Sequence, residues 1–257
     1  MPPAAQRCAR AVIEYDGTAF AGSQRQPQQR TVQGELEDVL NKLTGERITI
    51  RFAGRTDAGV HAPGQVIAFC LPSRPRGEWI GWAELRRLWN AALAPDVVVR
   101  SLRSAPPGFD PRRAAVARTY RYRIRQDGDR RPTDRHRALE IPDHLDAAAM
   151  RDAAARLVGE RDFAALGSDP RGRTVRHVMA VSIRQQGTLI EVTVQGNAFL
   201  RRMVRSLVAV LLAVGRGQMA PSEVEQVLED RRRALYGRAA PARGLTLERI
   251  SFGRQEK

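Results

Sequence analysis

Two successive halves of this 257-residue chain predict the same order of elements, namely strand, helix, strand, strand, helix, strand. Apolar residues alternate with polar ones in the predicted strands and recur at helical spacing in the predicted helices. This order is the split βαβ, or ferredoxin-like (RRM-like), pattern. We therefore predict an α/β (α+β) fold of two ferredoxin-like βαββαβ halves. Their antiparallel sheets would join around a central active-site cleft, with the helices on the opposite face.

The first half is predicted to span residues 1–105. Its expected strands are 7–15, 48–52, 65–70 and 97–102. Thr31 is typical of an N-cap, and Val32, Leu36 and Leu40 follow it on one helical stripe. A second helix is expected over 79–94, where Trp79 belongs to the apolar face.

The second half is predicted to span residues 106–257. Its expected strands are 115–125, 175–184, 189–194 and 245–252. Its expected helices are 145–158, 199–214 and 221–228. In the first of these strands, alternation places Tyr120, Tyr122 and Ile124 on one face and arginines on the other. Gln186-Gly187 indicates a hairpin between the second and third strands.

The composition favours a polyanionic partner. The formal net charge is +15 and the sequence pI is about 11.3, which points to nucleic acid before membrane. All 43 basic residues except Lys42 and Lys257 are arginine. Arginine suits bidentate phosphate contacts, but genome composition produces the same bias, so both explanations stay open.

Cysteine and histidine usage points away from disulfides and metals. Cys8 and Cys70 are too few for a disulfide framework or a zinc site, and the four histidines lack ligand spacing. We therefore expect reduced cysteines, no metal and a cytoplasmic location. No signal peptide is expected at the start of the chain. The longest apolar run, 207–214, is too short to span a bilayer.

The stretch Phe-Ala-Gly-Arg-Thr-Asp-Ala-Gly-Val-His-Ala-Pro-Gly, residues 52–64, is the strongest candidate for a site. Its three glycines and one proline predict a tight loop between two strands, and Asp57 lies within it. An aspartate in such a turn most often accepts hydrogen bonds from its own backbone. His61 alone is likewise more often a polar residue at the rim of a site than a catalyst.

Resemblance shifts this balance. Residues 54–62, Gly-Arg-Thr-Asp-Ala-Gly-Val-His-Ala, resemble the signature of the tRNA pseudouridine synthase A family, whose loop aspartate is catalytic. The resemblance extends to five other segments. They are 13–17, 20–26, 109–122 and two C-terminal motifs at 197–205 and 241–245.

The resemblance implies an isomerase that converts uridine to pseudouridine at positions 38–40 of the tRNA anticodon stem-loop, as a homodimer and without cofactors. It implies that Asp57 is the catalytic carboxylate, acting either as a nucleophile on ribose C1′ or as a base. Tyr120 would stack on the uracil and remove the C5 proton. Arg205 would keep Asp57 ionised, although a solvated helix arginine is the alternative for Arg205.

The same resemblance implies four further substrate contacts. Arg55 would bind phosphate or fill the space of the flipped base, and Arg25, His61 and Arg112 would contact RNA. Other arginines are candidate phosphate contacts: Arg113, Arg121, Arg123, Arg125, Arg171, Arg173, Arg176, Arg201 and Arg202.

The sequence departs from the family pattern at three places. Ser23 stands where the family commonly has tryptophan, Asp110-Pro111 replace His-Ala, and Thr246 replaces tyrosine.

Two other functions compete with the isomerase. A noncatalytic RNA-binding protein of paired RRM-like folds would show the aromatic RNP1 pattern, which neither half has. An aspartate-dependent N-glycosidase would release free base.

Overall fold

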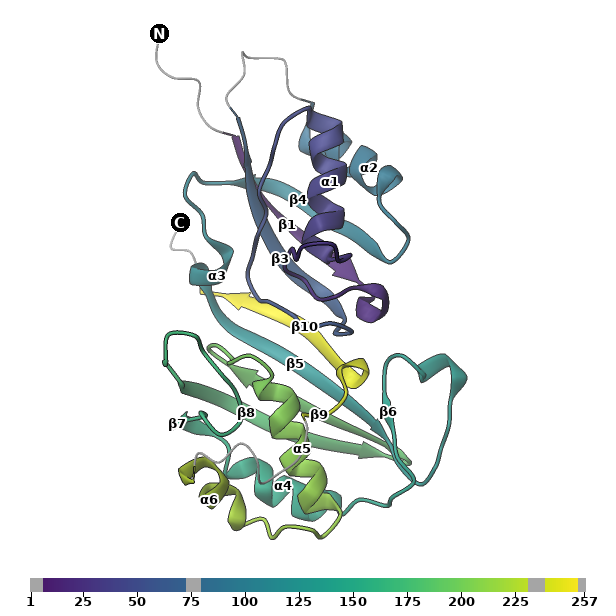
Figure 1. The fold of residues 1–257 in the computed structure, drawn as a ribbon, viewed down its shortest axis with the longest axis vertical. Helices are drawn as coiled ribbons and strands as arrows, with labels where there is room; N and C mark the ends of the chain where they lie inside the picture. The colour runs from purple at the N-terminus through teal and green to yellow at the C-terminus, as the bar shows by residue number, and fades with distance from the viewer. Residues whose placement is uncertain (1–6, 73–79, 231–238, 254–257) are drawn as a thin grey trace. The chain divides into compact units, whose positions relative to one another are not determined.

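The computed structural model describes residues 7–72, 80–230 and 239–253. The chain forms two compact units, one of Met1–Val116 with Leu247–Lys257 and one of Ala117–Thr246. Each unit combines helices with a β-sheet, which is antiparallel in the first unit and includes one short parallel strand in the second (Figure 1). Within the described residues, no helix has the length and apolar character needed to cross a membrane.

The first unit contains a four-stranded sheet in the order β2-β3-β1-β4. Its strands are β1 (Arg7–Tyr15), β2 (Arg51–Phe52), β3 (Ala62–Leu71) and β4 (Val97–Ala105). Its helices are α1 (Val32–Thr44), α2 (Trp82–Ala92) and the short α3 (Pro111–Ala114), with a 3-10 turn η1 at Gly17–Ala19. This is the strand order of a ferredoxin-like unit, as the sequence predicts.

Helices α1 and α2 pack beside each other against one face of this sheet (Figure 1). Trp89 of α2 is fully buried, lies edge-on to Phe69 of β3 and donates its indole N–H to the Leu36 carbonyl of α1. The predicted N-cap is confirmed, because the Thr31 hydroxyl accepts the Gly34 N–H at 3.1 Å. Of the predicted second helix, Trp79 lies outside the described residues.

The strand predicted over 48–52 is wrong in its extent, since only Arg51–Phe52 pairs as β2. The backbone of the residues before Arg51 bonds to side chains of α1 and does not pair with β3. Glu37 accepts the Ile50 N–H at 2.8 Å, and Asn41 accepts the Ile48 N–H at 2.8 Å. Alternating apolar residues are therefore buried here without a strand partner.

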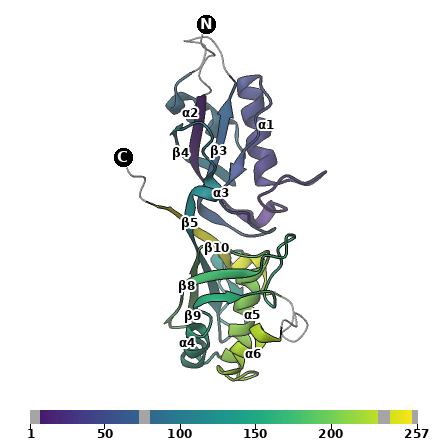
Figure 2. The same cartoon turned by 90° about the vertical axis from the view of Figure 1, so that its left-hand side faces the viewer.

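A second sheet has the order β10-β5-β9-β8-β7, with β6 pairing β5, and most of its strands belong to the second unit. Its strands are β5 (Ala115–Arg125), β6 (Leu139–Glu140), β7 (Gly159–Asp162), β8 (Val175–Gln186), β9 (Leu189–Gly196) and β10 (Leu245–Phe252). The helices of the second unit are α4 (Ala147–Ala155), α5 (Met203–Gly215) and α6 (Glu223–Glu229), with 3-10 turns η2 (Pro132–Asp134) and η3 (Ala242–Gly244). Helices α4 and α5 pack together beside β8 and β9 (Figure 2).

The predicted faces of β5 are confirmed, since Tyr120, Tyr122 and Ile124 are all buried. The predicted β8–β9 hairpin and the last strand are confirmed as well. The helix predicted to begin at residue 199 begins at Met203 instead. Arg202 takes a left-handed conformation with φ 65°, and the Arg201 N–H bonds to the Ser168 carbonyl, so the backbone there is not helical.

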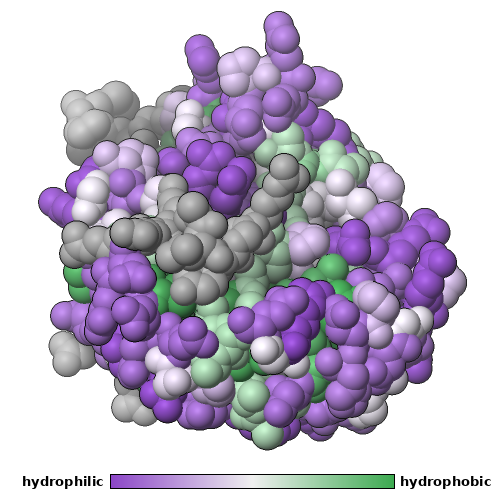
Figure 3. Space-filling model, turned by 60° about the horizontal axis from the view of Figure 1, so that its bottom comes forward, coloured by the Kyte–Doolittle hydropathy of each residue, from purple (hydrophilic) through white to green (hydrophobic). Residues whose placement is uncertain are grey.

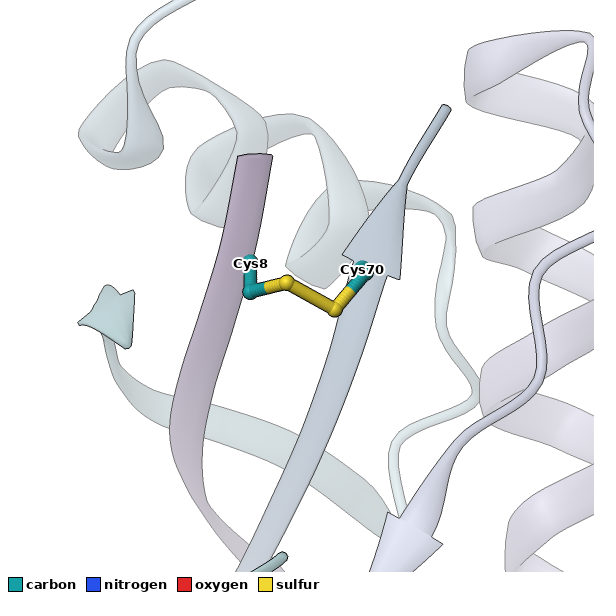
Figure 4. The surroundings of a disulfide bond; sticks show 2 residues. All are labelled: Cys8 and Cys70. Carbon is teal, nitrogen blue, oxygen red and sulfur yellow. A yellow bond between two sulfur atoms is a disulfide. The ribbon is translucent and has the colours of Figure 1, made fainter. Parts of the chain in front are cut away.

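The prediction of reduced cysteines is wrong, because Cys8 and Cys70 form a disulfide (Figure 4). The two residues are direct partners in the register of β1 and β3, which brings their Cβ atoms together. Two cysteines cannot build a multi-disulfide framework, but two that face each other across a strand pair are enough for one bond. The count of cysteines therefore did not predict their pairing.

We expect reduction of this disulfide to destabilise the first unit by up to about 4 kcal/mol, because the bond closes a loop between residues 62 positions apart. Thermal unfolding with and without a phosphine reductant measures the effect. A Cys8→Ser/Cys70→Ser double variant is the control and should not respond to reductant. Equal unfolding temperatures for the wild type with and without reductant would contradict the prediction.

Candidate active site

Asp57 lies in the first unit, in the loop between the end of β2 at Phe52 and the start of β3 at Ala62. It begins a tight turn in which its carbonyl accepts the Val60 N–H at 3.2 Å. Gly59 has φ +80° at the third position of that turn, where a side chain would be strained. The Asp57 side chain is half-buried. The loop thus displays a carboxylate on a turn that glycine makes possible.

Two buried polar residues of the sheet hold the loop before Asp57. Gln65 of β3 is fully buried, donates to the Gly54 carbonyl at 2.6 Å and accepts the Gly54 N–H at 3.3 Å. The Tyr15 hydroxyl of β1 shares a hydrogen bond of 2.8 Å with the Thr56 hydroxyl. Burial raises the pKa of Tyr15 to about 12, so this hydroxyl keeps its proton at neutral pH.

The segment after η1 supports the loop from another side. The Gly59 N–H bonds to the Phe20 carbonyl at 3.4 Å, and the Ser23 N–H bonds to the Thr56 carbonyl at 3.1 Å. Ser23 and Thr56 are both buried. The backbone of the loop is therefore tied to β1, β3 and this segment together, which restricts where the Asp57 side chain can point.

His61, predicted as an RNA contact, is only 5% exposed. Its Nδ1 accepts the Gly17 N–H at 3.1 Å, and its carbonyl accepts the Leu247 N–H of β10 at 2.9 Å. Gly17 has no space for a side chain, because a Cβ there would lie 2.1 Å from the Val60 carbonyl oxygen. In this position the His61 ring braces the η1 turn against the loop.

Arg55 and Arg112 lie near each other in the first unit. Burial, followed by the cation of Arg112, lowers the pKa of Arg55. Arg112 is held by α3, whose N-cap Asp110 accepts the Arg112 N–H at 2.8 Å and the Arg113 N–H at 3.2 Å. Asp110, one of the departures from the family pattern, thus has a structural role here. Arg55 lies two residues before Asp57 in the sequence, and two neighbouring guanidinium groups suit a bound phosphate.

Arg25 has acidic partners in the structure. Its Nε lies 2.9 Å from Glu37 and one terminal nitrogen lies 2.7 Å from Asp38, both on α1. The side chain remains 46% exposed. Asp38 and Glu37 raise the pKa of Arg25, Asp38 most strongly. These contacts fasten the 20–30 segment to α1, and an RNA contact would have to use the exposed part of the guanidinium.

Tyr120 lies in the second unit, in β5, and is 7% exposed. Its ring packs edge-to-face with Phe199 at 5.2 Å between centroids. It pairs in register with Val194 of β9. The ring is thus fixed in orientation by an aromatic neighbour from the segment that precedes α5.

Arg205 lies in the first half of α5 and is partly buried. Its Nε donates to the Ala240 carbonyl at 2.6 Å, and its own carbonyl accepts the Ala240 N–H at 3.0 Å. Tyr122 lies in the same environment and donates its hydroxyl to the Pro241 carbonyl at 2.8 Å. Burial raises the pKa of Tyr122, while the cations of Arg205 and Arg243 act in the opposite direction. The 240–243 segment therefore positions the Arg205 side chain.

Several arginines predicted as phosphate contacts have carboxylate partners instead. Arg123 and Arg125 both bind Asp134, and Arg176 binds Asp169 at 3.0 Å. These ion pairs fasten the loops that carry Asp134 and Asp169 and reduce the charge offered to RNA. Hydrophilic residues still cover most of the face shown in Figure 3, with apolar residues visible only between them.

Sequence reasoning missed the residues that hold the loop. Gln65 carried a signal, since it is a polar residue at the start of an apolar strand and buried polar groups need partners. Tyr15 and Ser23 carried none, because their partners are distant in sequence. In the part of the chain that the structure describes, no three His, Cys, Asp or Glu side chains gather as a metal site would require.

Comparison with known proteins identifies the family. The model of the tRNA pseudouridine synthase family matches residues 11–102 and 153–253, which include Asp57 and Arg205 but not Tyr120. A solved Cbf5-Nop10-Gar1 complex matches with a TM-score of 0.32 and 14% identity, over 80% of this chain and 54% of that chain. That similarity is too low to support a conclusion.

The curated relatives are far more similar and match over nearly their whole length. The tRNA pseudouridine synthase A of Geobacter sulfurreducens is 41% identical over 96% of this chain and 100% of its own. That of Thermotoga neapolitana is 41% identical over 94% and 98%, and that of Brevibacillus brevis is 40% identical over 95% and 98%. With this identity over nearly the whole chain, and with the match to the family model, the chain belongs to the tRNA pseudouridine synthase family, a family of isomerases.

Proposed function

We propose that this enzyme isomerises uridine to pseudouridine at positions 38–40 in the anticodon stem-loop of tRNA, with Asp57 as its catalytic carboxylate. The observation that carries the proposal is the Asp57 turn. Gln65 and Ser23 bind the backbone just before the turn, at Gly54 and Thr56, and the Val60 N–H closes the turn on the Asp57 carbonyl. This is the preorganisation that a reacting group needs. The turn also lies inside the region that the family model matches.

The chemistry is balanced without a cofactor. The bond between ribose C1′ and uracil N1 breaks, the base turns, and C5 bonds to C1′. N1 gains a proton, C5 loses one, and substrate and product have the same formula. An ionised carboxylate can stabilise or trap the electron-poor C1′, or remove a proton from the sugar. We assign this step to Asp57 and leave both routes open.

The resemblance to the family assigns the remaining roles. Tyr120 stacks on the uracil and removes the C5 proton, and Arg205 provides the positive charge that favours ionised Asp57. Arg55 and Arg112 bind phosphate, which the neighbouring positions of their guanidinium groups support. Each catalytic residue is held by a contact within its own unit, namely Phe199 for Tyr120 and Ala240 for Arg205.

A tritium assay tests the activity directly. A tRNA transcript carrying tritium at C5 of its uridines should release tritium to water as pseudouridine forms, because C5 exchanges its hydrogen for C1′. A matched transcript with cytidine at positions 38–40 is the control and should release none. Release from both transcripts would refute the proposed positions, and release from neither would refute the proposed function.

The same assay separates the competing functions. An N-glycosidase would release free uracil and leave the ribose in the RNA, whereas a noncatalytic RNA-binding protein would yield neither tritium nor base. The family membership favours the isomerase over both. Mapping pseudouridine in tRNA from cells that lack this protein gives the corresponding result in vivo.

We further propose that the enzyme acts in the cytoplasm, where its tRNA substrate is found, and as a homodimer. The resemblance to the family supports both statements. Sedimentation of the purified enzyme at micromolar concentration tests the second, since a homodimer has twice the mass of the 257-residue chain. A single species with the mass of one chain would contradict it.

We expect binding of tRNA to weaken about 100-fold between 50 and 200 mM salt, which corresponds to roughly five phosphate contacts. The net charge of +15 supports such a response. Filter binding across this salt range measures it. Arg100→Gln is a matched control, because Arg100 binds Glu14 at 2.7 Å and is not among the candidate phosphate contacts, so this variant should have the same salt slope as the wild type. A flat response of the wild type would argue against phosphate-dominated binding.

A further inference from the structure

We propose that Ser23 is a positioning residue for Asp57, acting through the backbone of Thr56. The inference rests on the proposed catalytic role of Asp57. Ser23 is one of the positions at which this sequence departs from the family pattern, and it makes no ion pair or ring contact that would mark it as important. Its significance lies in where its hydroxyl is placed.

Ser23 binds both polar backbone groups of the residue before Asp57. Its Oγ accepts the Thr56 N–H at 2.9 Å, and its own N–H donates to the Thr56 carbonyl at 3.1 Å. Its side chain is fully buried, and Thr56 is only 8% exposed. Water therefore has little access to replace the bond to the Thr56 N–H, and a buried N–H without an acceptor is costly.

The support behind Ser23 is rigid. Its carbonyl accepts the Gln33 N–H at 2.9 Å, and the Gly22 carbonyl accepts the Val32 N–H at 3.2 Å, both from the first turn of α1. Those N–H groups are among the donors that a helix start leaves without an intrahelical partner. A continuous path of hydrogen bonds thus runs from the start of α1 through Ser23 to Thr56.

Gly22 makes the close approach possible. Its φ is +104°, and a Cβ at this position would lie 3.0 Å from the Thr56 carbonyl oxygen and 3.4 Å from the Ala58 nitrogen. Any other residue at position 22 would push the segment away from the loop. The backbone geometry therefore brings the position 23 side chain against Thr56.

A serine is chemically suited to this place. Its hydroxyl has acceptor lone pairs, whereas the indole of tryptophan offers only an N–H donor and cannot accept the Thr56 N–H. The Thr56 side chain is held separately by Tyr15 at 2.8 Å, so loss of the Ser23 hydroxyl would release the backbone alone. The direction of the next side chain, Asp57, depends on that backbone.

The test is a Ser23→Ala variant assayed by tritium release and by tRNA binding. We expect kcat to fall about 10- to 100-fold with Kd for tRNA within about twofold, because the carboxylate loses its orientation and the phosphate contacts remain. Ser23→Thr retains the hydroxyl, so the logarithm of its kcat should lie at least halfway from that of Ser23→Ala to that of the wild type. Folded Ser23→Ala with kcat within twofold of the wild type would overturn the proposal.

Thr31→Ala is the matched control. Thr31 is buried, lies in the same region and accepts the Gly34 N–H at 3.1 Å, but it has no bond to Thr56. Its loss should lower the melting temperature while leaving kcat within about twofold. If Ser23→Ala and Thr31→Ala instead change melting temperature and kcat in parallel, Ser23 acts only on stability and the proposal fails.

Amide hydrogen exchange provides a readout in the wild-type protein, which does not require any variant to fold. The Thr56 N–H should exchange at least about tenfold more slowly than the N–H of the exposed Ala58. Equal rates would overturn the proposal. The outcome is separable from the proposed function: if Asp57→Ala is inactive but Ser23→Ala is not impaired, only the Ser23 inference fails.

Discussion

An Asp57→Ala variant is expected to lose pseudouridine formation by at least about 1000-fold while binding tRNA within about tenfold of the wild type. The carboxylate is the group to which we assign the chemistry at the sugar, so its removal leaves no substitute. It contributes little to affinity, because phosphate contacts dominate binding. Tritium release measures the rate, and filter binding measures the affinity.

The control for this variant is Asp152→Ala. Asp152 lies on α4, is 57% exposed and contacts Arg156 at 3.5 Å. Its replacement changes the net charge by the same amount and should leave the rate unchanged within about twofold. Turnover by Asp57→Ala at more than a tenth of the wild-type rate would remove Asp57 from the chemistry.

An Arg205→Lys variant is expected to lower kcat by on the order of 10- to 100-fold with a smaller effect on tRNA binding. Arginine uses its Nε to bind the Ala240 carbonyl and keeps its two terminal nitrogens for other partners. Lysine has three donors on a single nitrogen and cannot reproduce the fork in which Nε and the terminal nitrogens face different partners. Charge is preserved in this variant, so a loss of rate reports geometry.

The matched control is Arg216→Lys, the same substitution at the other end of α5. Arg216 binds Asp143 at 2.8 Å, and its C-cap position lies at the opposite end of the helix from Arg205. Its kcat should stay within about twofold of the wild type. An Arg205→Lys enzyme that is as fast as this control would exclude a geometric role for Arg205.

The sequence predicted well those elements in which the alternation of polar and apolar residues corresponds to an exposed and a buried face. Residues 115–125 alternate between a buried and an open face, and β5 has these bounds. The prediction over 48–52 failed because Ile48 and Ile50 bond to side chains of α1, a contact that alternation cannot reveal. The start of α5 was predicted too early because Arg202 adopts a left-handed backbone conformation that interrupts the helix. The apolar pattern of the sequence gives no sign of this conformation.

The candidate site was predictable only in part, for a similar physical reason. Asp57 and Arg205 lie in local motifs, so adjacent residues are enough to propose them as site residues. Ser23, Tyr15 and Gln65 act through hydrogen bonds to residues 11 to 41 positions away. Such pairings depend on strand register and loop docking, which follow from the assembled fold. The Cys8–Cys70 disulfide also depends on strand register, since the pairing of β1 with β3 places the two cysteines opposite each other.

The hydrogen bond from the Leu247 N–H to the His61 carbonyl connects the Asp57 loop with a strand that is synthesised much later in the chain. The backbone of Glu248 also lies against Gly64, where a Cβ would meet the Glu248 carbonyl oxygen at 2.6 Å. During translation at 5–20 residues per second, Leu247 emerges roughly 10–40 s after His61. A nascent chain therefore carries the Asp57 loop for tens of seconds before Leu247 can bond to His61.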